Sequence, residues 1–112
     1  METVVAKKPF VVHPGDDRTY GFGFGTVLPT DVTVSSVDSV VVSGGDGALT
    51  SASPAVVSSQ SVDALGNTIE ANEGASAKLS GGTAGEDYEV TVTITDSTSE
   101  KIAGVFPVLC RN

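Results

Sequence analysis

The chain has 112 residues, of which 14 are acidic and 6 are basic, so its net charge is −8 and its isoelectric point about 4.2. This length suits one domain with a single core and excludes two domains of ordinary size. The acidic excess repels phosphate backbones and anionic lipids, which excludes nucleic acid and membrane surfaces as expected partners.

Half of the chain consists of 18 Val, 13 Ser, 12 Thr and 13 Gly residues. β-branched residues favour strands, and Gly and Ser favour turns, so the composition predicts an all-β protein. The single cysteine, Cys110, cannot form an internal disulfide, so stability rests on core packing. The N-terminus lacks the apolar run of a signal peptide, and we expect the translated chain to be the mature one.

The first ten residues are expected to form an extended N-terminal arm, followed by a single domain at residues 11–112. Residues 1–9 mix apolar and basic side chains and end in a proline, which favours a segment that is disordered or paired with something else. Apolar residues in a loose terminus need burial somewhere. The residues of this region expected to contact neighbouring subunits are Val4, Val5, Phe10 and Val11.

After a turn at Pro14–Asp17, the segment Thr19–Gly25 alternates strictly and predicts a strand. One face carries the rings of Tyr20, Phe22 and Phe24, which we expect to anchor the core. The other face is bare backbone that another strand, loop or partner can approach closely. The expected backbone contact points for a partner on that face are Gly21 and Gly23.

The segment Asp31–Ser43 reads as one long strand or two short ones. Val32 and Val34 share one face of this segment, whereas Val37 and Val41 fall on the other. A bulge near the two serines that separate these pairs would explain the change of face.

Turns and short strands are expected from residue 43 to residue 79. A glycine-rich break and a proline-containing stretch come first, followed by a predicted strand at Val56–Val62 and a turn at Asp63–Asn67. Two further short strands are predicted at Thr68–Glu70 and Ser76–Leu79.

The clearest strand pattern spans Tyr88–Thr95, which alternates between apolar and polar side chains. Tyr88 follows a turn directly, a place where sandwich proteins often set a tyrosine whose hydroxyl bonds back to that turn, so we assign it a structural role. Lys101–Leu109 is predicted as the last strand, and Pro107 marks it as an edge strand or one that ends early. About seven or eight short strands favour an immunoglobulin-like β-sandwich, with a small barrel as the alternative.

The residues that could support catalysis or metal binding are few. His13 is the one imidazole, so any Ser-His-acid or Cys-His arrangement would depend on it. One histidine and one cysteine leave a zinc site without clustered ligands, and the acidic loop residues lack the spacing of a calcium loop. We therefore expect no enzyme activity, no cofactor and no metal.

A run within Ala77–Thr91, Leu-Ser-Gly-Gly-Thr-Ala-Gly followed by Tyr and Val-Thr, resembles the tailed-phage fiber-tail adaptor family of small immunoglobulin-like virion proteins. Lys8-Pro9 and the alternating strand from Tyr20 to Phe24 are similar to other parts of that family's pattern. The chain differs in having no Trp, with Phe24 standing where the family usually places one.

The resemblance implies a phage virion structural protein that joins the tail or neck to fibers through protein-protein contacts, without catalysis. Its partners would be tail, neck or fiber subunits, with multiple copies in a symmetric assembly in the virion, after synthesis in the bacterial host cytoplasm. One alternative is a capsid decoration (cement) protein that binds the major capsid protein and stabilises the phage head. Another is a carbohydrate- or ligand-binding β-sandwich module.

Overall fold

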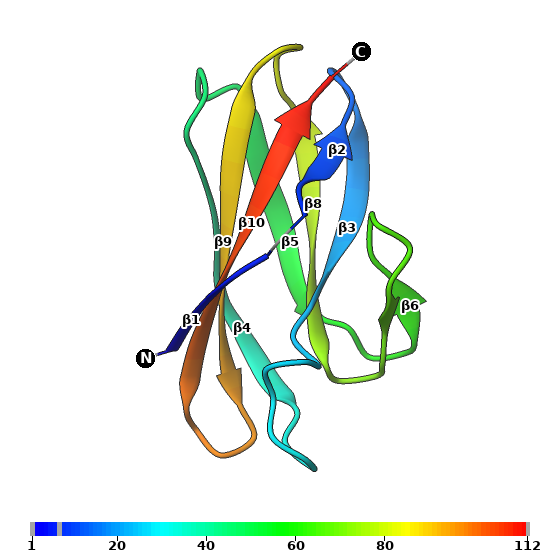
Figure 1. Ribbon diagram of the computed structural model, residues 1–112, viewed down its shortest axis with the longest axis vertical. Coiled ribbons are helices and arrows are strands. Elements are labelled where there is room, and N and C mark those ends of the chain that lie inside the picture. The colour runs from blue at the N-terminus through cyan, green and yellow to red at the C-terminus, as the bar shows by residue number, and fades with distance from the viewer. Residues whose placement is uncertain (1, 7, 112) are drawn as a thin grey trace.

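A computed structural model describes residues 2–6 and 8–111, which contain ten strands (Figure 1). Met1 and Lys7, from the predicted arm, and Asn112, at the end of the predicted domain, lie outside the described residues. Within the described ranges no element is a helix, and none could span a membrane as one. The all-β prediction is confirmed.

The strands form two larger sheets and one small hairpin. The first sheet has the order β1 (Glu2–Val5), β10 (Lys101–Cys110), β9 (Asp87–Asp96) and β4 (Val34–Ser43), and β2 (Phe10–Val12) also pairs with β10. The second sheet has the order β3 (Asp17–Gly23), β8 (Gly74–Gly81) and β5 (Leu49–Val56). The hairpin pairs β6 (Ser61–Val62) with β7 (Thr68–Ile69).

One hydrophobic core lies between the two sheets, and all four phenylalanines of the chain meet in it. The Phe22 ring centroid is 5.5 Å from that of Phe10 and 4.9 Å from that of Phe106. Phe24 packs edge-on against Phe106 at 6.0 Å. Tilted and offset rings at such distances pack favourably, so β3 holds the second sheet against β10 of the first.

The N-terminal segment lies along the chain's own last strand, which differs from the expected disordered or externally paired arm. β1 pairs in parallel with β10 from Glu2↔Ile102 to Val5↔Val105, and β2 continues this at Phe10↔Val108. The physical reason is that the outer edge of β10 presents main-chain groups that need partners, and the N-terminal strands satisfy them.

Pro107 neither ends β10 nor marks it as an edge strand, because β10 continues to Cys110 and has neighbours on both sides. Val105 accepts a hydrogen bond from the Ala6 N–H at 2.9 Å, so the main-chain groups of Val105 face the N-terminal segment. Two residues further on, the proline nitrogen faces the same side, in the gap between β1 and β2. Among the described residues, no strand needs an N–H from this position.

Two register irregularities interrupt β4. The first lies between Val34 and Ser36, where the sequence predicts a bulge. The second, between Val37 and Ser39, was not predicted, and it separates the faces of Val37 and Val41. Val37 packs against the core whereas Val41 is exposed, so the prediction that they share a face is wrong.

The predicted strand at Val56–Val62 is also wrong, because β5 ends at Val56 and contains Pro54. β5 is an edge strand, and its register shifts between Ala52 and Ala55. Prolines are tolerated at edges and bulges, which explains how the strand accommodates one.

The hydroxyl of Tyr88 bridges two loops. It accepts a hydrogen bond from the Thr83 N–H at 3.0 Å and donates one to the Asp46 carboxylate at 2.6 Å. Asp46 also accepts hydrogen bonds from the Thr83 hydroxyl at 2.5 Å and the Ala48 N–H at 3.1 Å. The Thr83 and Tyr88 bonds hold the pKa of Asp46 down to about 2. The loop before β5 is thereby joined to the turn before β9.

The outward face of β3 and β8 receives Ile69 from the hairpin. A Cβ placed on Gly21 would lie 2.8 Å from Ile69 Cδ1, and one on Gly74 would lie 2.5 Å from Ile69 Cγ2. Ile69 is 2% exposed although it does not belong to the main core. The absence of side chains on these glycines therefore lets the hairpin dock on the sheet.

This packing predicts different outcomes for two cross-strand glycines, Gly74 and Gly23. A Cβ at Gly74 would also lie 2.8 Å from the Phe22 carbonyl oxygen, so Gly74→Ala should lower the free energy of unfolding by about 1–3 kcal/mol. Gly23→Ala is the matched control, because its Cβ would make an ordinary 3.5 Å contact with Ile69. Urea unfolding measures both, and equal effects would contradict this account.

The Asp46 bonds predict a dependence of stability on acid. The folded-state pKa lies below the ordinary value of 3.8, so this stabilisation is present above that pH and is lost as the pH falls to about 2. Asp46→Asn removes the titrating carboxylate, so its melting temperature should fall less steeply than that of the wild type over this interval. Thermal melts at stepped pH test this, and identical slopes would refute it.

Candidate functional site

Two hollows adjoin each other along the open side of β3 and share Asp63 as a lining residue. The larger has a volume of about 950 Å³ and the smaller about 260 Å³. The N-terminal segment lines one side of both and the β6–β7 hairpin lines the other. We call the combined hollow the β3 trough, which follows the chain from Arg18 to Val27.

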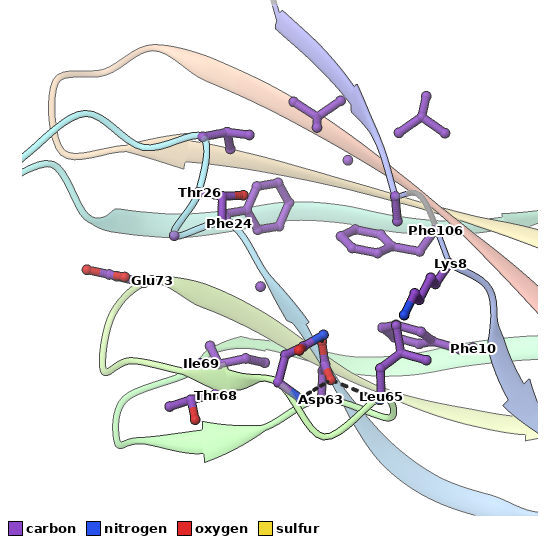
Figure 2. Close-up of a pocket in the computed structure, with 18 residues that line it drawn as sticks. Lys8, Phe10, Phe24, Thr26, Asp63, Leu65, Thr68, Ile69, Glu73 and Phe106 are labelled. Carbon is purple, nitrogen blue, oxygen red and sulfur yellow. Dashed lines mark hydrogen bonds between the residues drawn. The ribbon is translucent and has the colours of Figure 1, made fainter.

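Aromatic rings and hairpin residues face each other across the larger hollow (Figure 2). The rings of Phe10, Phe24 and Phe106 belong to the core and form its apolar side. Leu65 and Ile69, on the hairpin, also line this hollow. The trough is therefore a groove with an apolar lining.

Exposed apolar side chains gather at the trough. The large hydrophobic residues exposed among the described residues are Val5 (62%), Val11 (49%), Val41 (54%), Val62 (63%) and Leu65 (39%). All of these except Val41 line one of the two hollows, whereas Val41 lies on β4 at the far edge of the first sheet. Clustered exposed apolar residues mark interaction sites, whereas scattered ones do not.

The edge of β3 along the trough has unpaired main-chain groups. Among the described residues, β8 is the one strand that pairs with β3. The Phe24 N–H donates to the Glu73 carbonyl at 2.8 Å, and alternation then directs the groups of Gly23, Gly21 and Thr19 away from β8. No hydrogen bond from another described residue reaches these groups.

Positive side chains are found at the trough although the chain as a whole is acidic. Three cations form ion pairs elsewhere, as Lys78–Asp17, Lys101–Asp38 and Arg111–Asp87. Lys8 lines the larger hollow and Arg18 the smaller, and neither forms an ion pair with another described residue. The Asp63 carboxylate accepts hydrogen bonds from two main-chain N–H groups of its own turn, those of Leu65 and Asn67, each at 2.9 Å. Asp63 lines both hollows and Glu73 lines the larger, so the charges of the lining balance overall, and Arg18 is the cation of the smaller hollow.

The six residues predicted as an interface all line the trough. Val4, Val5, Phe10 and Gly23 line the larger hollow, and Val11 and Gly21 line the smaller. Phe10 is 2% exposed, so its ring belongs to the core and is not presented to a partner. The outward face of Gly21 is covered by Ile69 of the same chain, which leaves its edge groups as the part open to a partner. The residues assigned structural roles, Tyr88, Tyr20, Phe22 and Phe24, lie in the core.

Sequence reasoning missed the hairpin side of the trough, formed by Val62, Leu65 and Ile69. The turn at Asp63–Asn67 was recognisable from its composition. Its two flanking strands have only two residues each, which is too short for alternation to reveal the face on which they pack.

The side chains that could act in catalysis or bind a metal do not come together in the described residues. His13 Nδ1 lies 2.8 Å from the Arg111 carbonyl oxygen, at the surface. Cys110 is buried, and burial raises the pKa of its thiol. In the described ranges no three His, Cys, Asp or Glu side chains group closely enough to hold a metal ion.

The chain belongs to the family of the podophage GP4 fiber-tail adaptor protein gp77, whose family model matches residues 13–106. The resemblance noted in the sequence is thereby confirmed. The matched range contains β3 to β9 and most of β10. No curated protein and no solved structure matches the chain.

The predicted arm contains a core residue, Phe10, and an exposed residue, Val5, and their substitution should separate these roles. Phe10→Ala should lower the free energy of unfolding by about 3–5 kcal/mol, because it removes a ring from the aromatic core. Val5→Ala should change it by less than about 0.5 kcal/mol, because Val5 is 62% exposed. Urea unfolding of both variants provides the comparison, and a small effect at Phe10 would show that the N-terminal segment does not contribute to the core.

Proposed function

We propose that this protein joins the podophage tail to its fibers, using the β3 trough as a binding surface for a neighbouring virion subunit. A tail structural role follows from the family to which the chain belongs. The observation that carries the proposal of a binding surface is the gathering of four exposed apolar side chains at one groove.

We further infer an immunoglobulin-like sandwich. The order β3-β8-β5 in one sheet and β4-β9-β10 in the other corresponds to the two sheets of that fold. Tyr88 at the start of β9, bonded back to Thr83, supports the same assignment. In this proposal the chain is one domain at residues 11–112 that follows an N-terminal arm at residues 1–10, and the last residue of the arm, Phe10, is buried.

The proposed role is one of binding without catalysis or cofactor. The partners are tail and fiber subunits, and several copies of the chain are arranged about the symmetry axis of the tail. The net charge of −8 disfavours direct contact with nucleic acid and supports partners that are proteins.

The position of the protein on the particle tests the proposal. Purified phage particles labelled with an antibody against this chain should carry the label at the tail, where the fibers attach. Label over the head would instead indicate a cement protein, and particles without label would overturn both roles.

A charge placed in the trough should impair assembly, whereas the same charge elsewhere should not. Val62→Asp puts a carboxylate among apolar side chains that we propose to be buried on binding, so the amount of fiber per particle should fall at least about tenfold. Val41→Asp is the matched control, since Val41 is comparably exposed on β4. Quantitative mass spectrometry of purified particles measures the fiber content, and equal losses for both variants would contradict the assignment.

A further inference from the structure

We propose that the partner binds by adding a strand to the free edge of β3. The occupant is an extended, apolar segment that carries carboxylates and belongs to a tail or fiber subunit. The identity of the partner protein rests on the proposed function, whereas the mode of binding rests on the geometry of the trough.

The main-chain groups of β3 provide the first argument. The groups of Thr19, Gly21 and Gly23 point along the sheet into the trough, and no described residue bonds to them. A row of unpaired N–H and C=O groups is a template for another strand. β3 has seven residues, so an added strand of similar length would satisfy the edge.

The shape of the trough provides the second argument. Successive side chains of a strand point to opposite faces. Those on one face of an added strand would meet Val5 and Val11 of the N-terminal segment, and those on the other would meet Val62 and Leu65 of the hairpin. Both sides are apolar and exposed, which favours apolar side chains in the added strand.

The charges at the trough provide the third argument. Lys8 and Arg18 stand at the two hollows and form no ion pair with any other described residue. A segment with a carboxylate near the Arg18 end would place its charge beside an unpaired cation. The acidic surface of the rest of the chain would disfavour the same segment elsewhere. An apolar strand with a carboxylate beside Arg18, and away from Asp63 and Glu73, therefore fits the trough.

Two substitutions at Gly23 test the strand addition. Gly23→Pro removes an N–H that faces the open edge and should be tolerated by the fold, because prolines are accepted on edge strands. Gly23→Ala keeps the N–H, and its Cβ makes an ordinary contact with Ile69. In phage that carry these variants, the fiber content of purified particles should be at least about tenfold lower for the proline than for the alanine.

The outcomes separate this inference from the proposed function. Normal fiber content with Gly23→Pro would overturn strand addition while leaving the adaptor role intact. Equal losses with both variants would also overturn it, since the N–H would then not matter. A wild-type chain that is absent from tails would overturn the adaptor role itself. Should Gly23→Pro fail to fold, Thr19→Pro and Thr19→Ala make the same comparison at the other end of the edge.

A cross-link identifies the occupant. A photoreactive amino acid placed at Val62, in the smaller hollow, should attach to a tail or fiber subunit within the particle. Mass spectrometry should locate the attachment in an extended apolar segment that contains Asp or Glu. Attachment to residues 2–5 of a second copy of this chain would show exchange of N-terminal strands and overturn the assignment to another subunit. If particles contain the variant but yield no cross-linked product, the assignment of the occupant to a tail or fiber subunit would also be overturned.

Discussion

The strict alternation of rings and glycines along β3 is the constraint on which the rest of the structure depends. On one side, Tyr20, Phe22 and Phe24 fill the space between the sheets, and the two phenylalanines meet Phe106 from β10. On the other side, the lack of side chains lets Ile69 approach the backbone. A bulky residue at Gly21 would displace the hairpin, and the trough would lose one of its sides. A single strand thus contributes to both the core and the proposed binding surface.

The fold class and the strongest strands could be predicted because their signals are local. The predicted strand at Tyr88–Thr95 lies within β9, and the pattern of Thr19–Gly25 covers most of β3. The misplaced elements depend on tertiary context that no local pattern carries. Pro54 sits inside β5 because a register shift accommodates it, and Pro107 sits inside β10 because β1 and β2 leave a gap beside it. A proline therefore interrupts a strand only where a neighbouring strand needs a hydrogen bond from the missing N–H.

Only part of the site could be predicted, for a related reason. All six residues chosen for the interface lie along the trough, since loose apolar residues and bare glycines are visible in sequence. The hairpin residues that complete the trough lie about forty residues further along the chain, and only the folded structure brings them beside β3. The burial of Phe10 could not be predicted either. An aromatic residue in a terminal segment gives the same sequence pattern whether its ring packs on its own chain or on another.

The parallel pairing of β1 with β10 also determines how the molecule would respond to mechanical force. Glu2 lies beside Ile102 at the start of β10, and the chain leaves the far end of β10 at Arg111 (Figure 1). Pulling the two ends apart would slide β1 along β10, so that all hydrogen bonds between them resist together and do not open one at a time. In the proposed adaptor role, tension applied through these ends would thus be resisted by all of these hydrogen bonds at once.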